Sequence, residues 1–298
     1  MTALLDMTNQ WCFNIDKGML NGVIFLDLKK AFDTIDHAIL QMKLACHGLK
    51  ECSLEWVESY LTNRVQVCHV NGIYSNEETI SCGVPQGSIL GPVLFLLYIN
   101  DLPSCLEHGI ARLFADDTNI TSTGCNLESV GNKMQIELNK IFKWLCANKL
   151  TLNILKTDFM VIASRQKLAA LGDSITLSVN GVSLSQVRSV KSLGVNIDEN
   201  LTWENHVESI RLKVSRNIAT LRRLKPILTQ KNLVSLYRAI IEPYFIYCSI
   251  VWDSLGQTLD RSLQILQNRA ARVITGAHFS TSSSKLLKEL GWMNIQEM

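Results

Sequence analysis

The segment Leu113-Phe114-Ala115-Asp116-Asp117-Thr118-Asn119-Ile120 places two adjacent carboxylates between two short apolar runs. This pattern predicts a tight hairpin with Asp116 and Asp117 at its tip. Neighbouring carboxylates repel each other and resist joint burial, so a cation normally compensates them, and an oxygen-preferring divalent ion such as Mg²⁺ is the usual one. Taken alone, the pair favours a solvated turn, because Asp and Asn are common turn residues.

The composition is that of a folded protein. Of the 298 residues, 47% are hydrophobic and 19% are charged, which excludes a disordered chain and allows one large or two modest domains. Because the net charge is only +2, a nucleic acid would have to be held by local basic patches. The nine cysteines form no zinc-like spacing, which favours free thiols in a reducing compartment.

Neither a membrane span nor a signal peptide is predicted. The longest apolar run, Val93–Ile99, is far shorter than the ~20 residues that a membrane helix needs. The N-terminus also lacks a basic segment followed by a long apolar block. We therefore expect a nuclear or cytoplasmic protein.

A further acid lies at the end of a predicted strand. Val23–Leu28 is apolar except for Asp27, and a carboxylate there is costly unless it is paired or bound to a metal. The alternative is that Asp27 lies outside the core and caps the following turn. Helices are predicted at about 36–47 and 53–63, followed by a hairpin through Asn71-Gly72.

The segment Gly83–Pro92 predicts a rigid loop that leads into an apolar helix, because it holds three glycines and two prolines. Gln86 stands between Pro85 and Gly87 on this stiff platform and suits contact with a substrate. An ordinary helix-entry loop is the alternative interpretation.

The rest of the chain predicts a mixed part and then a helical part, with a boundary near residue 200. Apolar residues three or four apart from Leu127 to Leu145 predict an amphipathic helix across a sheet, with Asn126 as its N-cap. Strands are predicted at 158–163, at 175–179 and 182–184 around a second Asn-Gly, and at 190–197 as one strand with a glycine bend. Helices are predicted from about Trp203, at 231–252 with a kink near Pro243, and at 259–274.

One of these helices is strongly basic. Residues 211–225 contain six cations and no acid. Such a helix can follow a phosphate backbone, although a solvated helix face explains the charges equally well. The cations are Arg211, Lys213, Arg216, Arg222, Arg223 and Lys225.

A common explanation exists for Asp27, the Asp116–Asp117 pair and the Gln86 loop. Two antiparallel elements side by side would bring Asp27 next to Asp116, and carboxylates from both can bridge two magnesium ions. Two ions ~3.5–4 Å apart stabilise the attacking and leaving oxygens of a phosphoryl displacement. That chemistry requires little from the protein beyond positioning and charge.

Several motifs, in the same order, resemble those of reverse transcriptases. The residues Phe25–Asp33 resemble the first catalytic motif, Gly83–Ser88 the nucleotide loop, and Phe114–Asp117 the acidic hairpin. The sequence from about residue 23 to about residue 275 is similar to that of the reverse transcriptases of non-LTR (LINE-type, jockey-like) retrotransposons. Several motifs in the same order are far more specific than a single motif. The similar segments include Tyr98–Pro103, Trp144–Thr157 and Leu193–Val195.

The resemblance implies a role for each matching residue. Asp27 and Asp116 would bind two Mg²⁺ ions, Leu28 would lend its backbone carbonyl, and Asp117 would complete the acidic cluster. Phe32 would exclude a ribose 2′-hydroxyl, or is only a core aromatic. Gln86 and Gly87 would line the incoming nucleotide, and Lys156 would donate a proton near the pyrophosphate, or is only a surface lysine. Leu193 and Gly194 resemble the primer grip, and Arg211, Arg216, Arg222 and Arg223 would hold template–primer phosphates.

The implied fold is α+β, a right-hand polymerase palm with partial fingers (1–200) followed by a helical thumb and C-terminal helices (201–298). The implied function is an RNA-directed DNA polymerase core that extends a DNA primer with deoxynucleoside triphosphates on an RNA template. Members of this family carry more fingers sequence, with basic residues for the triphosphate, ahead of the first motif. Only about 22 residues precede it here, so we expect an N-terminally truncated polymerase. The alternative is a catalytically inactive nucleic-acid-binding remnant; a two-metal hydrolase fits the motif order less well.

Overall fold

The computed structural model describes residues 2–171 and 175–297. It divides into two compact units. The sheet unit is Trp11–Val187, and the helical unit combines Met1–Gln10 with Arg188–Met298, so that the division passes through helix α1 (Thr2–Asp16). The palm and thumb modules predicted at 1–200 and 201–298 are functional divisions and stay predictions.

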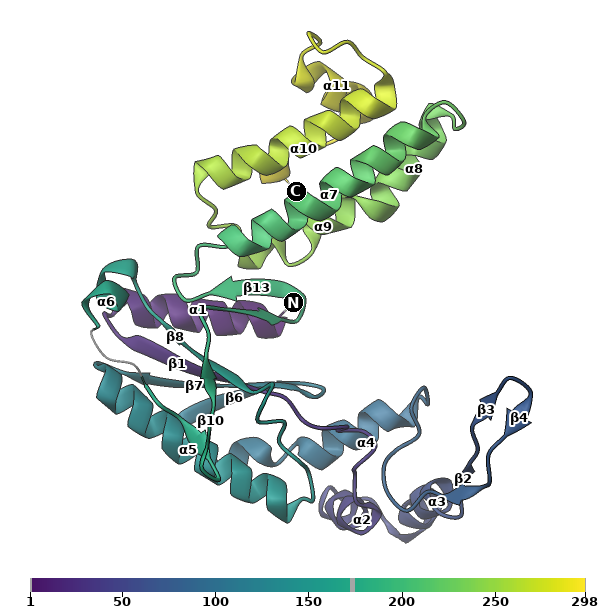
Figure 1. The fold of residues 1–298 in the computed structure, drawn as a ribbon, viewed down its shortest axis with the longest axis vertical. Coiled ribbons are helices and arrows are strands. Elements are labelled where there is room, and N and C mark those ends of the chain that lie inside the picture. Colours follow the sequence, from purple (N-terminus) through teal and green to yellow (C-terminus); the bar gives the residue numbers. More distant parts are fainter. Residues whose placement is uncertain (1, 172–174, 298) are drawn as a thin grey trace. The chain divides into compact units, whose positions relative to one another are not determined.

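The sheet unit is built on a five-stranded sheet with the strand order β11-β8-β1-β7-β6 (Figure 1). β1 lies at the centre and pairs antiparallel with both β7 and β8, and β7 pairs antiparallel with β6. The edge strand β11 is parallel to β8. The strands are β1 (Leu20–Leu26), β6 (Gly109–Phe114), β7 (Asp117–Gly124), β8 (Asp158–Ile162) and β11 (Ser185–Gln186).

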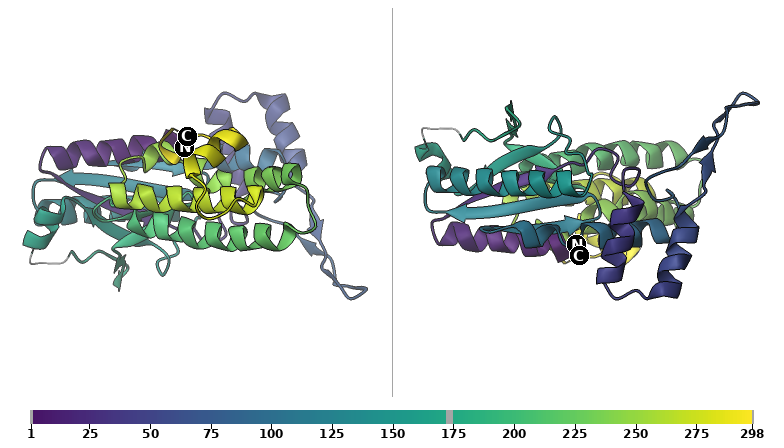
Figure 2. Two further views of the ribbon diagram at one scale, coloured as in Figure 1. Left: turned by 90° about the horizontal axis from the view of Figure 1, so that it is seen from above. Right: turned by 90° about the horizontal axis from the view of Figure 1, so that it is seen from below.

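Helix α5 (Leu127–Ala147) covers one face of this sheet (Figure 2). Its buried residues Val130 and Met134 approach Gly22 of β1 so closely that a Cβ there would lie 2.2 Å from Met134 Sδ. A larger residue at this strand position would force these helix side chains to shift. Asn126 caps the helix by accepting the N–H of Ser129 at 2.8 Å. The predicted amphipathic helix and its cap are confirmed.

The second half of α1 packs on the sheet through polar as well as apolar contacts. Trp11 Nε1–H donates to Thr121 Oγ1 at 3.0 Å, and Asn14 Nδ2 donates to Asn21 Oδ1 at 2.7 Å. All four side chains are buried. No pattern in residues 1–20 predicted this helix.

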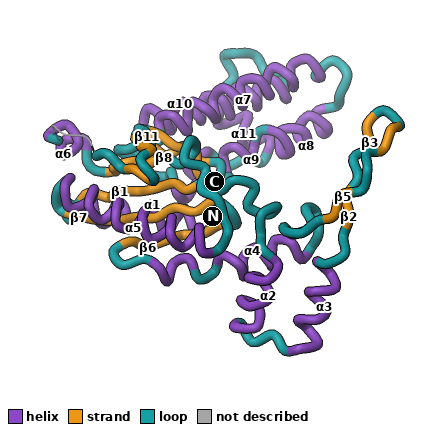
Figure 3. The backbone as a smooth tube through the Cα atoms, turned by 60° about the horizontal axis from the view of Figure 1, so that its bottom comes forward, coloured by secondary structure: helices purple, strands orange, loops and turns teal. Residues whose placement is uncertain are grey.

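Helices α2 (His37–Cys46), α3 (Glu51–Leu61) and α4 (Leu90–Ile99) lie at one end of the sheet unit, and a narrow β-ladder extends beyond α3 (Figure 3). Its outer pair turns at Asn71-Gly72, as predicted. The pairs are β2 (Val65–Gln66) with β5 (Glu78–Thr79) and β3 (His69–Val70) with β4 (Ile73–Tyr74). The unit also contains η1 (Leu102–Cys105), α6 (Arg165–Ala170), β9 (Ser178–Val179) and β10 (Val182–Ser183).

The helical unit buries a stripe of α7 (Glu204–Leu224), including Val207, Val214 and Leu221. The stretch Gln230–Val251 is long and apolar enough by composition to cross a membrane. It is divided into three short helices, with the predicted break near Pro243, so it forms no continuous span of ~20 residues. The other elements are α8 (Gln230–Ile240), α9 (Glu242–Ile246), η2 (Ser249–Val251), α10 (Gln257–Thr275), α11 (Ser283–Leu290) and η3 (Ile295–Glu297).

The single strand predicted at 190–197 was wrong. The chain forms two antiparallel strands, β12 (Ser189–Ser192) and β13 (Val195–Asp198), joined by the turn Leu193-Gly194. Leu193 and Gly194 have φ values of 45° and 83°. Two consecutive positive φ angles are the conformation of a two-residue hairpin turn, so they reverse the chain where a bend was predicted.

His206 is a buried titratable group of the helical unit, with 6% of its surface exposed. Its Nδ1 accepts the N–H of Asn196 at 3.4 Å, and its ring meets Trp252 edge-on with 5.7 Å between centroids. Burial lowers the pKa of His206 to about 4, and the nearby Lys213 contributes to the decrease. The imidazole is therefore neutral at physiological pH.

We expect the helical unit to lose stability as the pH falls from about 6.5 to 4, because the unfolded chain takes up a proton that the folded His206 does not accept. A pKa depressed to this extent changes the free energy of unfolding by about 3 kcal/mol at most over this pH range. His206→Asn, which keeps an acceptor for Asn196 and does not titrate, should flatten this dependence. Thermal unfolding followed by tryptophan fluorescence at pH 4–7 measures it. If the thermal midpoints of His206→Asn and the unsubstituted chain changed equally with pH, His206 would not be the source of the dependence.

Candidate active site

The β6–β7 hairpin carries two acids to the end of β1. The predicted hairpin is confirmed, but its tip lies one residue earlier than predicted: Phe114 pairs with Asp117, so Ala115 and Asp116 form the two-residue turn. Ala115 has a φ of 53°, a left-handed conformation that costs free energy for alanine. Leu26 pairs with Thr118, so continuing the register by one residue places Asp27 opposite Asp117. Sequence reasoning had placed Asp27 beside Asp116.

These three carboxylates concentrate negative charge. Burial raises the pKa of Asp117, and the charges of Asp116 and Asp27 raise it further. Among residues 2–171 and 175–297, no cation forms an ion pair with any of the three. Carboxylate oxygens without a cationic partner are the donor set that Mg²⁺ prefers, so the residues fit this ion chemically. As the side chains of the described residues lie, no three acidic, histidine or cysteine groups converge closely enough to hold a metal.

Asp27 is held by the segment that follows α5. Asn153 Nδ2 donates to Asp27 Oδ2 at 2.7 Å, and the Asn153 N–H donates to the Asp27 carbonyl at 2.8 Å. The Asp27 N–H donates to Thr157 Oγ1 at 3.3 Å. Sequence reasoning missed Asn153, whose only signal was its place in the polar stretch after α5. The exposed Lys156 belongs to the same turn, since its N–H donates to the Asn153 carbonyl at 3.0 Å.

The residues just after Asp27 are packed into the core. Leu28 is buried and forms an isolated β-bridge with Leu152. Phe32 is half-buried against Phe95 of α4, with 4.6 Å between the ring centroids. Phe32 therefore contributes to the core and still keeps part of its ring at the surface.

The glutamine loop is docked on the turn that follows Asp27. The Gly83 N–H donates to the Ile35 carbonyl at 2.7 Å, and Gln86 Nε2 donates to Asp33 Oδ1 at 2.7 Å. A Cβ at Gly83 would lie 2.7 Å from the Asp33 carbonyl oxygen, so only glycine allows this approach. Gly87 also adopts a positive φ, 79°. Sequence reasoning did not identify Asp33 as the partner of Gln86.

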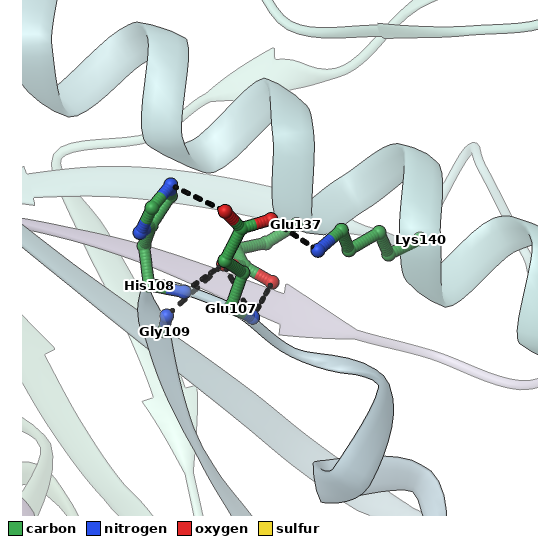
Figure 4. A network of polar contacts seen from close by, with 5 residues as sticks. All are labelled: Glu107, His108, Gly109, Glu137 and Lys140. Carbon is green, nitrogen blue, oxygen red and sulfur yellow. Dashed lines mark hydrogen bonds and ion pairs between the residues drawn. The ribbon is translucent and has the colours of Figure 1, made fainter.

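The hairpin is fixed at the start of β6 by Glu137 of α5 (Figure 4). This carboxylate has no exposed surface, and it accepts the backbone N–H groups of Glu107 and Gly109 at 3.1 Å and that of His108. Glu107 in turn forms an ion pair with Lys140 at 2.5 Å. The loop that leads into the acidic hairpin is therefore tied to the helix that covers the sheet.

The remaining predicted residues belong to the helical unit. The Leu193 carbonyl accepts the hydroxyl of Tyr247 at 2.7 Å, and that ring leaves little room for a side chain at Gly194. Arg211 forms an ion pair with Glu208 at 2.6 Å. The four predicted thumb arginines are exposed on α7; they are Arg211, Arg216, Arg222 and Arg223.

We expect Asp117→Asn to raise the thermal midpoint of the sheet unit at pH 7 without divalent metal. Since the pKa of Asp117 is raised in the folded state, stability falls as the pH rises through that pKa, and the penalty is fully present at pH 7. Because the side chain is partly exposed, we expect roughly 1–2 °C. The difference should disappear at acid pH, where the Asp117 carboxyl is protonated in both the folded and the unfolded chain. If the thermal midpoint of Asp117→Asn at pH 7 were below that of the unsubstituted chain, the inferred repulsion of Asp117 by Asp27 and Asp116 would be contradicted.

Comparison with known proteins gives matches along most of the chain. A sequence model of the family described as reverse transcriptase (RNA-dependent DNA polymerase) matches residues 5–197. A probable RNA-directed DNA polymerase from transposon X-element of Drosophila melanogaster is 27% identical over 274 residues, which cover 90% of this chain and 30% of that protein. The RNA-directed DNA polymerase from mobile element jockey of Drosophila funebris is 27% identical over 274 residues, covering 88% and 29%. The chain thus spans about 30% of the length of these relatives.

Solved structures of telomerase share the fold. Telomerase from Candida albicans in complex with a TWJ fragment of telomeric RNA gives a TM-score of 0.53 at 12% identity, over 97% of this chain and 54% of that chain. Apo telomerase from Candida tropicalis gives 0.51 at 13% identity, over 97% and 47%. These likenesses confirm the predicted α+β fold, with an antiparallel sheet packed on helices and helical thumb-like elements.

Proposed function

The chain belongs to the reverse transcriptase family of non-LTR retrotransposons, and from this premise we propose that it is the core of an RNA-directed DNA polymerase. It extends the 3′-hydroxyl of a DNA primer with deoxynucleoside triphosphates on an RNA template, in the nucleus or the cytoplasm. One observation carries the proposal. The pairing of Leu26 with Thr118 brings the next residue, Asp27, to the base of the turn that carries Asp116 and Asp117, and the Gln86 loop is docked on the turn just after Asp27.

Asp27, Asp116 and Asp117 would hold the two Mg²⁺ ions, and the Leu28 carbonyl would offer a further oxygen. When bound, such ions stabilise the attacking and leaving oxygens of phosphoryl transfer. The chain itself supplies the placement of the carboxylates. Asn153 keeps Asp27 in one orientation through its side-chain and backbone hydrogen bonds, and the two-residue turn holds Asp116 beside Asp117.

The incoming nucleotide lies against the elements around these acids. Gln86 and Gly87 line it, and Asp33 fixes the amide of Gln86 by accepting its N–H. The exposed part of Phe32 excludes a ribose 2′-hydroxyl and so favours deoxynucleotides. Lys156, exposed on the turn that binds Asp27, donates a proton to the leaving pyrophosphate.

The helical unit binds the template–primer duplex. Leu193 and Gly194 form the primer-grip turn, which Tyr247 supports from one side. The arginines of α7 contact duplex phosphates without reading sequence. They are Arg211, Arg216, Arg222 and Arg223.

Template-directed incorporation tests this function. An RNA template of mixed sequence with an annealed DNA primer is offered one deoxynucleoside triphosphate at a time, and the product is sized on a denaturing gel. We expect one-nucleotide addition only with the complementary nucleotide. Duplex binding measured on the same preparation identifies the alternative, an inactive nucleic-acid-binding remnant, which binds and adds nothing.

A further inference from the structure

A cavity of about 640 Å³ lies beside the Gln86 loop, wholly within the sheet unit. Three parts of the chain form its wall: the turn after Asp27, the base of the β2–β5 ladder, and the loop Ile80–Gln86. Two cations line it, Lys30 from the turn and Arg64 from the base of the ladder. Neither residue was singled out by the sequence motifs.

The positive charge of this cavity is only partly compensated, because its lining holds two cations and one acid. Within the described ranges 2–171 and 175–297, neither Lys30 nor Arg64 takes part in an ion pair. Asp33 is the only acid among the lining residues, and its Oδ1 already accepts the amide N–H of Gln86 at 2.7 Å. A concave site with two cations and one occupied carboxylate favours an anion.

The two cations are exposed, and the surrounding structure contacts the Arg64 side chain and fixes the Lys30 backbone. The Arg64 guanidinium lies 5.7 Å from the centroid of the Tyr60 ring, and its Nη1–H donates to the Tyr60 carbonyl at 3.4 Å. The Arg64 carbonyl accepts the N–H of Ile80 at 2.9 Å, which closes the ladder base. Lys30 occupies a left-handed backbone position, with a φ of 49°, in the turn that docks the loop. Such preorganisation lowers the entropy cost of binding.

We propose that this cavity binds a phosphate group of a nucleotide or polynucleotide, with Arg64 and Lys30 as its charged donors. The guanidinium supplies paired N–H donors that match phosphate oxygens, and the lysine supplies a point charge. Thr79 and Ser81 also line the cavity and offer hydroxyl groups. The inference rests on the proposed function, under which two sources of phosphate lie near Gln86: the triphosphate of the incoming nucleotide and the backbone of the template strand.

Two binding measurements distinguish these sources. The first follows a fluorescent oligo(rA) strand by anisotropy at several salt concentrations. The second follows a fluorescent, non-hydrolysable analogue of dTTP added to the complex with poly(rA)–oligo(dT). The variants are Arg64→Gln, Lys30→Gln and the double variant. Arg64→Lys retains the charge, and Lys50→Gln and Arg188→Gln remove exposed cations elsewhere. Circular dichroism confirms that each variant is folded.

We expect the double variant to weaken one of the two interactions about tenfold and the control variants to leave both within twofold. If the strand is the ligand, the slope of log affinity against log salt should fall by about 0.7 for each lost phosphate contact. If the double variant weakens binding of the analogue and leaves binding of the strand unchanged, the cavity binds the triphosphate. Unchanged binding in both measurements overturns the proposal, as does an unsubstituted chain that binds neither probe. Neither measurement requires extension, so a chain that binds through this cavity without adding nucleotides contradicts only the polymerase function.

Discussion

Asp116→Asn should reduce primer extension by about 1000-fold or more and leave the affinity for the template–primer duplex within about twofold. The substitution removes one negative charge from the acidic cluster without changing the size of the side chain, and a metal ligand supplies several kcal/mol of transition-state stabilisation. Under the proposed function, cations of the helical unit hold the duplex, and this substitution does not alter them. Extension on a denaturing gel and duplex binding by anisotropy, on the same preparation, measure the two effects.

Asp16→Asn is the matched control, because it removes an exposed carboxylate at the end of α1 in the same unit. It should extend primers as the unsubstituted chain does. Extension by Asp116→Asn at an unchanged rate would remove Asp116 from the site. If Asp116→Asn lost both duplex binding and primer extension, the substitution would disturb the fold rather than the chemistry.

Glu137→Ala should destabilise the sheet unit by about 3–5 kcal/mol, the largest effect on stability that we expect. Glu137 is fully buried and accepts three consecutive backbone N–H groups of the loop before β6. Its removal leaves three backbone donors without the buried acceptor that they share, and an unsatisfied donor shielded from water costs about 1–3 kcal/mol. Urea unfolding followed by far-UV circular dichroism measures the change.

Two further variants make this expectation specific. Glu137→Gln keeps one acceptor oxygen and should cost less than Glu137→Ala. Glu128→Ala removes an exposed carboxylate from the first turn of the same helix and should change stability by less than about 1 kcal/mol. An equal decrease in the free energy of unfolding for Glu128→Ala and Glu137→Ala would show that the hydrogen bonds from Glu137 to the loop do not stabilise the fold.

Sequence patterns predicted the elements whose signals are local. The hairpin at Asp116 has its apolar flanks, the outer ladder has Asn71-Gly72, and α5 has a regular apolar stripe behind the Asn126 cap. Helix α1 lacked such a stripe because polar Thr8 and Asn14 are buried along with its apolar residues. The turn at Leu193 was missed because leucine seldom adopts a positive φ.

The site was predictable only in part, for a related reason. The Asp residues were predicted from their motifs, but the position of Asp27 relative to Asp116 and Asp117 depends on the strand register. Asn153 and Asp33 act through contacts with Asp27 and Gln86, and their residue types alone carry no signal of such contacts. Arg64 acquires its place beside the Gln86 loop only when the ladder closes. Long-range packing therefore determines these residues' positions.

Primer extension by the unsubstituted chain on poly(rA)–oligo(dT) with Mg²⁺ tests the central claim most directly. The account predicts metal-dependent lengthening of the DNA primer, which the Asp116→Asn variant does not support. No lengthening in the presence of salt-sensitive duplex binding would contradict the claim, and would identify a chain that holds the template–primer but lacks nucleotidyl transfer.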